Sequence, residues 1–449
     1  MAATAPGAGG RVAGVTEPRA APTVSSLARR PALPANVKIL AAVSFLTDVA
    51  SDMIYPLLPV FLSTVLGVSA AGLGVIEGVA ESVSSLLRLP AGWYSDKIGR
   101  RKPLVVVGYA LAAVARPLIG LTQGLGQVLA IRVTDRFGKG VRTAPRDALI
   151  ADSVDESQRG YAFGLHRASD SLGSVLGPLV AWAVLTLGLT DLRGLFLWAA
   201  LPGLLSVVLL IVLVKEKRPR VAASQATVAS TATTKAERLP ATEGTPNAGS
   251  AATARPAPGA DAKESLGGPF RSYLLVLFLF TLSTSTDAFL LLRASQLGVS
   301  TTMVPILWAM LHVVKSGSTL AGGALSDRLG RRPLILGGWS VYALAYLGFA
   351  LATVQWHAWA LFLVYGLYFG FTEGPEKALV ADLAPASRRG AAFGWFNAAV
   401  GLAALPASVI FGIVWDKWGA QTAFVMGAAI AALASILFVL AVPRVARAA

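Results

Sequence analysis

The stretch IRVTDRFGKGVRTAPRDALIAD, residues 131–152, places many charges inside a segment that should span a membrane. It continues the apolar run of residues 125–130, and its charged residues recur every three or four positions, on one helical face. One charge at the bilayer centre costs roughly 2.5–3.5 kcal/mol on insertion scales. Such a face must therefore look onto a polar, water-accessible space or onto opposite charges, so the stretch predicts a polar pathway through a membrane protein.

The composition of the whole chain agrees with a membrane protein. Its 449 residues are 55% hydrophobic and 14% charged, with a mean hydropathy of +0.63, whereas soluble domains carry about 25% charged residues. Cysteine is absent, which excludes disulfides and thiolate metal sites. Bases gathered in short loops on one membrane face explain the net charge of +15, so no nucleic-acid partner is expected.

Hydrophobic segments of about 20 residues or more predict an all-α membrane protein with twelve transmembrane helices in two six-helix pseudo-repeats. The helices of the first half are expected at residues 38–64, 70–94, 103–122, 125–152, 160–188 and 193–214. Those of the second half are expected at residues 271–296, 301–326, 333–354, 357–384, 390–415 and 421–442.

The remaining segments predict tails and a linker. Residues 1–37 indicate a disordered cytoplasmic tail, residues 215–270 a flexible cytoplasmic linker, and residues 443–449 a short cytoplasmic tail, which leaves halves at 38–214 and 271–442. Basic loops alternate with loops that lack Lys and Arg. Both termini are therefore expected on the cytoplasmic side of a bacterial-type cytoplasmic membrane.

The two halves repeat each other in sequence. GWYSDKIGRR at 92–101 matches GALSDRLGRR at 323–332, LGVS recurs at 66–69 and 297–300, and residues 144–164 match residues 374–394, all at nearly constant offset. Parallel repeats in a twelve-helix protein imply that a solute binds between the halves near the midplane, while the halves rock against each other.

These motifs resemble the major facilitator superfamily of secondary transporters. The resemblance implies that the repeated loop latches the outward-facing state through its aspartate, which meets a helix terminus of the other half. The latch residues are Gly92, Asp96, Gly99, Arg100 and Arg101, repeated as Gly323, Asp327, Gly330, Arg331 and Arg332. The arginines of this loop can at the same time fix the orientation of the helices in the membrane.

Two further motifs are similar to the drug and organic-solute:proton antiporter branches of that superfamily. Arg132 matches an arginine tied to proton coupling, although Arg136 stands where glycine is usual. Gly173, Gly177 and Pro178 match the antiporter motif of the fifth helix, but residues 181–182 replace its usual Gly-Gly ending. Plain packing by small residues is the alternative explanation of this motif.

Ionisable residues inside the predicted helices are functional candidates by default. The candidates for proton coupling and the substrate cavity are Asp48, Asp52, Glu77, Glu81, Arg132, Asp135, Arg136, His166, Arg167, Asp170, Asp287, His312, Lys315, Glu373 and Glu376. We predict that Asp52, or alternatively Asp48, carries the proton, and that Arg132 or Arg136 competes for that carboxylate. Simple neutralisation of these acids by the two arginines is the structural alternative.

Other chemistry is not indicated by the sequence. No phosphate-binding loop occurs, so ATP is not the expected energy source, and no cofactor or metal site is expected from three scattered histidines.

We predict a proton-coupled secondary active transporter, not an enzyme, that exports a small anionic or zwitterionic organic solute, such as a metal chelate, by alternating-access antiport. A proton-coupled importer is the alternative, and a non-transporting receptor or membrane-embedded enzyme a further one. The expected partners are the solute, protons and membrane lipids, with the protein acting as a monomer.

Overall fold

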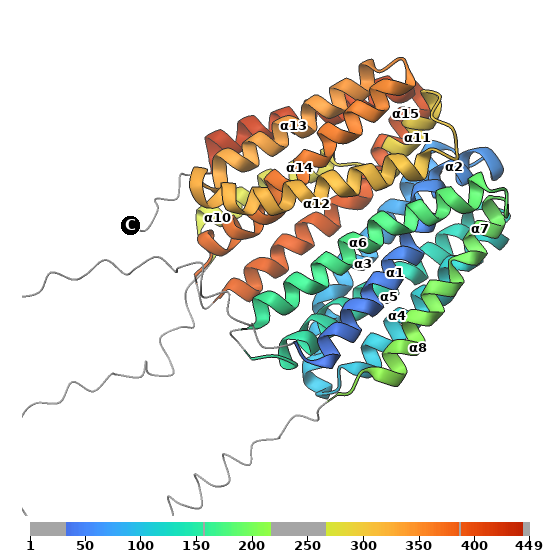
Figure 1. Ribbon diagram of the computed structural model, residues 1–449. Coiled ribbons are helices and arrows are strands. Elements are labelled where there is room, and N and C mark those ends of the chain that lie inside the picture. Colours follow the sequence, from blue (N-terminus) through green and yellow to red (C-terminus); the bar gives the residue numbers. More distant parts are fainter. Residues whose placement is uncertain (1–32, 156–157, 217–265, 386–387, 443–449) are drawn as a thin grey trace, which may run out of the picture.

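The computed structural model describes residues 33–155, 158–216, 266–385 and 388–442, and within these ranges the regular structure is helical. Figure 1 shows two bundles of long helices, one coloured blue to green and the other yellow to red, lying side by side. Residues 1–32 of the predicted N-terminal tail, the predicted C-terminal tail and most of the predicted linker fall outside the described residues, and α1 begins at Ala35, inside the predicted N-terminal tail. The twelve-helix prediction is confirmed, with two six-helix halves related as repeats.

Six helical rods make the N-terminal half. They are, in chain order, α1 (Ala35–Ile54) continued by η2 (Tyr55–Leu57), α2 (Leu58–Val60) and η3 (Phe61–Val65); α3 (Ala70–Ile98); α4 (Lys102–Leu118) with η4 (Ile119–Leu121); α5 (Leu125–Asp152); α6 (Arg159–Thr186); and α7 (Leu192–Trp198) with α8 (Ala200–Leu213). The first rod changes its helical form at Pro56 and Pro59, because proline has no N–H to donate to the preceding turn.

Six further rods make the C-terminal half. They are α10 (Gly268–Ser283) with α11 (Ala288–Gln296), α12 (Val304–Leu329), α13 (Arg331–Leu351), α14 (Gln355–Leu383) and α15 (Arg389–Ala441), which holds two rods. Gly419 separates those two rods with a φ of 86°, a left-handed conformation that glycine adopts without strain.

The rod predicted as one span at 271–296 is broken between α10 and α11. Two tyrosines of α13 stabilise the break: Tyr342 donates a hydrogen bond to the Ser283 carbonyl at 2.9 Å, and the Tyr346 hydroxyl lies 2.9 Å from that of Ser285. Irregular backbone at membrane depth is tolerated where protein groups satisfy it. No proline marks this break, so the sequence pattern did not reveal it.

Eight described helices are long and apolar enough to cross a membrane by length and composition, α15 among them. The rods outside that set are α1, α5 and α14. α5 carries charges along most of its length, and α1 contains Lys38, Asp48 and Asp52. In α14 the acidic residues and the lysine lie in the C-terminal part of the helix, and the first part holds polar and aromatic side chains among its apolar ones. Charged and polar residues therefore keep these rods out of a set chosen by length and apolar composition.

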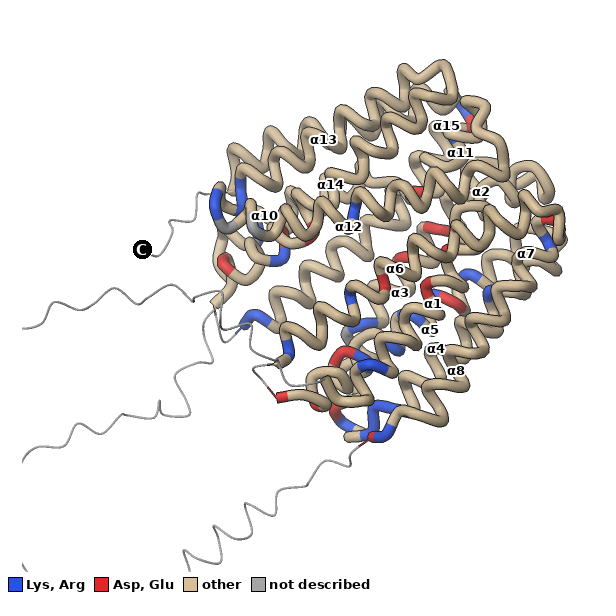
Figure 2. Tube along the Cα trace, in the orientation of Figure 1, with Lys and Arg blue, Asp and Glu red and all other residues tan. Residues whose placement is uncertain are grey.

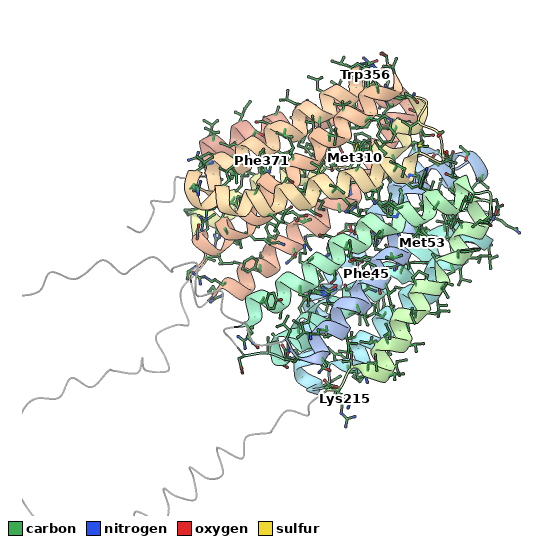
Figure 3. The ribbon with its side chains drawn as sticks, in the orientation of Figure 1. Phe45, Met53, Lys215, Met310, Trp356 and Phe371 are labelled. Atoms are coloured by element: carbon green, nitrogen blue, oxygen red, sulfur yellow. The ribbon has the colours of Figure 1, made fainter. Side chains whose placement is uncertain are left out.

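The ends of the rods lie on two faces of the bundle. We call the end with residues 99–101, 153–155 and 329–331 the basic-loop face, and the end with residues 66–69 and 187–191 the opposite face. In Figure 3, Lys215 marks the basic-loop face and Trp356 the opposite face. Charged residues gather at the basic-loop face and also along the middle of the N-terminal half (Figure 2). That the basic-loop face is cytoplasmic stays a prediction.

The halves meet along α3 and the first rod of α15. Gly74 lies against the Ser408 backbone and Gly78 against Leu405, at positions where a Cβ would collide with the neighbour. Nearer the middle, the Ser82 hydroxyl donates to the Gly401 carbonyl at 2.7 Å. Small residues at such positions allow two membrane helices to approach closely.

This contact occupies the half of each helix that is nearer the opposite face. Towards the basic-loop face, the side chains of Trp93 on α3 and Trp395 on α15 are 66% and 59% exposed. The two helices are thus closed against each other at the opposite face.

Asp416 strengthens this closure by capping a helix of the other half. Its carboxylate accepts the backbone N–H groups of Ala70 and Ala71, at 2.9 and 2.8 Å, in the first turn of α3. A carboxylate at this position satisfies two N–H groups that the helix leaves free and complements the helix dipole. Asp416 was not predictable as a functional residue, because one acid near a loop carries no signal in the sequence without knowledge of its neighbour.

Replacing Asp416 with alanine is expected to weaken closure at the opposite face. Loss of a helix cap typically costs about 1 kcal/mol, which corresponds to about a fivefold shift in the population of the closed state. Because the chain has no native cysteine, a single cysteine replacing Ala71 can report access of a water-soluble maleimide from this face. We expect faster labelling after Asp416→Ala and little change after Lys417→Ala; equal rates in both variants would contradict a locking role.

In the part of the chain that the structure describes, Asp96 of the predicted latch loop makes no ion pair or hydrogen bond with the C-terminal half. Asp96 is 72% exposed, and its ion pair is with Arg101 of the same half at 3.5 Å; Arg101 also pairs with Asp152. Gly99 ends α3 with a φ of 65°, which explains the glycine at this position. Asp327 lies on α12, but its side chain is outside the described part, while Arg331 pairs with Asp382 at 3.0 Å.

Candidate transport site in the N-terminal half

Arg132 on α5 is the centre of a buried ion-pair network. Its side chain is 4% exposed and donates two hydrogen bonds to the Glu77 carboxylate of α3, at 2.7 and 2.8 Å. It also lies 3.4 Å from Asp135, one turn further along α5. Two parallel N–H···O bonds make this a bidentate, charge-assisted pair, the geometry in which arginine binds carboxylates most strongly. The pair ties α3 to α5.

Arg116 on α4 completes the network from a third helix. Its Nε donates to Asp135 at 2.8 Å, and its Nη1 donates to the Thr47 carbonyl of α1 at 2.9 Å. Four helices of the N-terminal half are therefore joined through Arg116, Asp135, Arg132 and Glu77. Sequence reasoning missed Arg116, although it is the single charged residue between positions 104 and 122 and the rule for intramembrane charges applied to it.

Arg136 adds a looser pair to the same network. Its guanidinium lies 3.9 Å from Glu77 and 3.9 Å from Glu81, both on α3. The expectation that an acid of the first helix pairs with Arg132 or Arg136 is wrong for this structure, since the carboxylate partners come from α3 and α5. The physical reason is depth: Glu77 stands at the level of Arg132, with α3 packed directly on α5.

Asp48 and Lys139 stand beside this network without a close partner. Neither side chain makes a hydrogen bond or an ion pair within 4 Å to any residue that the structure describes. Asp48 on α1 interacts electrostatically with the acids Asp170 and Asp52 and with the bases Arg142 and Lys139. It can lie so deep between α1 and α6 because Gly173 of α6 packs against its Cβ.

The antiporter motif of the fifth helix, which is α6 in the structure, thus has a packing role in this state. Gly173 contacts the α1 backbone at Phe45, and Gly177 contacts it at Val49. Pro178, the next residue of α6, is also buried. These contacts agree with the packing explanation of the motif, which leaves its antiporter role as a prediction.

The C-terminal half offers aromatic rings in place of a charge network. Asp287 accepts the Tyr365 hydroxyl at 2.6 Å, and Glu376 accepts the Trp339 indole N–H at 3.0 Å. Tyr342 stacks on Tyr346 with ring centroids 4.2 Å apart. Each of these two acids is therefore held by a neutral aromatic donor rather than by a base.

Besides the contacts of Ser82 and Asp416, three further polar contacts cross between the halves among the described residues. The Asp52 carboxylate accepts the Trp308 indole N–H at 3.1 Å, and the Tyr55 and Thr286 hydroxyls lie 3.3 Å apart. Glu373 binds Lys315 of its own half at 3.1 Å and Arg167 of the N-terminal half at 3.0 Å. These groups face the boundary at which the halves must move. Trp308 and Tyr55 were missed because a tryptophan or tyrosine in a membrane helix carries no sequence signal of its own.

The histidines of the interior are buried without hydrogen-bond partners in the described protein. Both ring nitrogens of His166 are unpaired, and its nearest acid is Asp170, one turn along α6, at 3.8 Å. His312 on α12 has an unpaired Nε2, and its ring packs on Trp308 with centroids 4.9 Å apart. No group of three or more His, Cys, Asp or Glu residues that could hold a metal ion occurs in the described ranges.

A helical bundle with paired halves and ion pairs buried at membrane depth defines the class of integral membrane transporters. The Major Facilitator Superfamily sequence profile matches residues 40–405, so the chain belongs to that superfamily of transporters. An uncharacterised MFS-type transporter of Methanocaldococcus jannaschii is 31% identical over 408 residues, which cover 90% of this chain and 94% of that protein.

Two further comparisons agree with this membership. Sugar efflux transporter A of Dickeya chrysanthemi is 24% identical over 402 residues, which cover 88% of this chain and 92% of that protein. The crystal structure of a D-xylose-proton symporter has a TM-score of 0.67 at 18% identity, with 91% of this chain and 97% of that chain covered, and it shows the shared fold.

Proposed function

We propose that this transporter is a proton-coupled antiporter that exports a small organic zwitterion by alternating access. The observation that carries the proposal is the pair of opposite charges, Asp48 and Lys139, left without close partners beside a network in which Arg116, Arg132 and Arg136 each have a carboxylate. Buried charges are retained at membrane depth where they serve a pathway or a binding site.

A zwitterion fits this pair better than a simple anion. The Lys139 ammonium group can bind the carboxylate of the solute, while the Asp48 carboxylate can bind its amino group, so the charges of solute and protein cancel. The aromatic rings of the C-terminal half, including Tyr365 and Trp308, supply apolar walls for the rest of the solute.

Competition at one carboxylate supplies the coupling. A proton on Asp48 removes the charge that the amino group of the solute requires, and a bound solute amine excludes the proton. Proton and solute therefore occupy the site in alternation, which is the requirement of antiport. A simple anion would bind together with a proton, which leads to symport instead.

The proposed direction of transport, export, is supported by sequence resemblance and by the geometry of the two halves. The motif at Gly173, Gly177 and Pro178 resembles that of the antiporter branches, and one relative carries the name of a sugar efflux transporter. Because α3 and α15 are closed against each other at the opposite face, we also propose that the site opens towards the basic-loop face. If that face is cytoplasmic, as the basic loops favour, the solute is loaded from the cytoplasm. Import by symport is the alternative that the experiment must distinguish from export by antiport.

The test is a solute panel on purified protein in liposomes loaded with a pH-sensitive dye. The panel contains amino acids and betaines, mono- and dicarboxylates, and quaternary ammonium cations, each with an imposed pH gradient. We expect a zwitterion to move against the direction of the protons. Movement of cations or neutral solutes alone would refute the substrate class, and movement of solute with the protons would replace antiport by symport.

A further inference from the structure

We propose that Asp170 and His166 on α6 form a proton relay between Asp48 and the basic-loop face. The inference rests on the proposed proton coupling and extends it, because it assigns the route by which the proton reaches the solution rather than the acid that competes with the solute.

The four titratable groups descend through the bundle in steps. With a rise of about 1.5 Å per residue, Asp52 and Asp48 lie about 25 and 20 Å from the basic-loop end of α1, which begins at Ala35. Asp170 and His166 lie about 16 and 10 Å from the corresponding end of α6, which begins at Arg159.

The packing of α1 on α6 brings the two pairs together. Gly173, one turn from Asp170, contacts the Asp48 Cβ, and Asp48 and Asp170 interact electrostatically. His166 and Asp170 are separated by 3.8 Å between Nε2 and Oδ1, a gap that a small side-chain rotation closes to a hydrogen bond.

These groups are costly to bury for packing alone. Both nitrogens of His166 and the Oδ1 of Asp170 are buried without a hydrogen-bond partner among the described protein groups. Leaving a buried polar group without a hydrogen-bond partner destabilises the folded protein. A stable packing role would favour apolar residues or a closed hydrogen bond, whereas a relay requires groups that exchange partners.

The charges around His166 come from two helices. Asp170 and Arg167 are on its own helix, and Arg146 and Asp147 are on α5. Asp147 is paired with Arg146 at 2.9 Å, and Arg167 is paired with Glu373, so Asp170 is the acid left to exchange a proton with the imidazole.

The transfer balances in protons at every step. The Asp48 carboxylic acid gives its proton to the Asp170 carboxylate, directly or through a water molecule. Asp170 then protonates the His166 imidazole, and the imidazolium releases the proton to water at the basic-loop face. Each group returns to its starting state, and no oxidant or further reactant is required.

The first test measures the titration of His166 without any solute. Diethyl pyrocarbonate modifies neutral imidazole, so its rate at His166, read by mass spectrometry against pH, reports protonation of that residue. We expect the midpoint to move after Asp170→Asn and also after Asp48→Asn, because both acids share protons with the imidazole. His357, which accepts the Thr353 N–H near the opposite face, is the internal control. If the titration midpoint of His166 is unchanged in both variants, the relay is refuted.

The second test measures coupling in the dye-loaded liposomes, with the panel solute that the wild-type protein moves. His166→Gln is expected to slow gradient-driven flux at least about tenfold, the low side of what a positioned proton-transfer group contributes. Solute exchange without a gradient should stay within about twofold, and His357→Gln should match the wild type. Wild-type gradient-driven flux in folded His166→Gln and Asp170→Asn proteins would refute the relay. Absence of proton movement in the wild-type protein itself would instead contradict the proposed function.

Discussion

Arg132→Ala is expected to abolish transport and to lower the stability of the folded protein strongly. The substitution removes two hydrogen bonds of 2.7 and 2.8 Å and leaves the buried Glu77 carboxylate with only the Arg136 contact at 3.9 Å. Breaking a buried ion pair by removing one partner costs about 3–5 kcal/mol, because the remaining charge is uncompensated. The thermal midpoint of the purified protein in detergent should fall accordingly.

A second substitution separates the charge from the packing. Arg132→Ala combined with Glu77→Gln removes the stranded negative charge and should recover part of the lost stability, but not transport. Arg132→Lys keeps the positive charge without the bidentate geometry and should lie between the wild type and alanine. Lys417→Ala, at an exposed position, is the matched control for loss of a base. If the double variant is no more stable than Arg132→Ala, Glu77 is not the group that Arg132 neutralises.

The fold was largely predictable because membrane insertion constrains sequence strongly. A span needs about 20 apolar residues, and the repeat of the motif at 92–101 locates the second half. The charged span at residues 125–152 coincides with α5, since its flanking loops are short and polar. The break between α10 and α11 was not predictable, because it depends on hydroxyl groups of α13 that satisfy its backbone.

The site was predictable as a set of residues but not as a set of pairs. The spacing on α5 correctly placed Arg132 and Asp135 in the interior, where both are buried. It could not choose between Asp48, Asp52 and Glu77 as partners of Arg132, because helical spacing sets the face of a helix and not the depth of its neighbours. Arg116 was missed for a different reason. A single charge in an apolar span attracts less attention than the denser cluster of charges on α5.

The asymmetry between the halves was visible in the sequence and explains a division of roles. Bases and acids pair with each other in the N-terminal half, whereas Asp287 and Glu376 are held by Tyr365 and Trp339 in the other half. Such neutral donors can form a hydrogen bond with either the ionised or the protonated acid, although the two hydrogen bonds differ in strength. The N-terminal half is therefore the better candidate for proton coupling, and the C-terminal half for contact with the body of the solute.

Asp48→Asn is expected to abolish gradient-driven accumulation and to weaken solute exchange as well, because the amide lacks the charge that the amino group of the solute requires. The carboxylate has no close partner, so its replacement by an amide of the same shape strands no opposite charge within 4 Å and should cost little stability. Asp52 differs, because its carboxylate accepts the Trp308 indole N–H from the other half. The amide oxygen of asparagine can still accept that hydrogen bond, so Asp52→Asn should mainly slow turnover.

The two variants can be compared in one experiment that follows solute flux and internal pH together. Asp48→Asn should lose gradient-driven accumulation by at least about tenfold, the scale of a proton-transfer group, and exchange at equal solute concentrations should fall with it, because the solute amine has lost its carboxylate. Asp52→Asn should retain the ratio of protons to solute at a reduced rate. If Asp52→Asn uncouples the two fluxes and Asp48→Asn does not, Asp52 carries the proton; if both variants stay coupled, Glu81 becomes the next candidate, because it is the half-exposed acid of the same network.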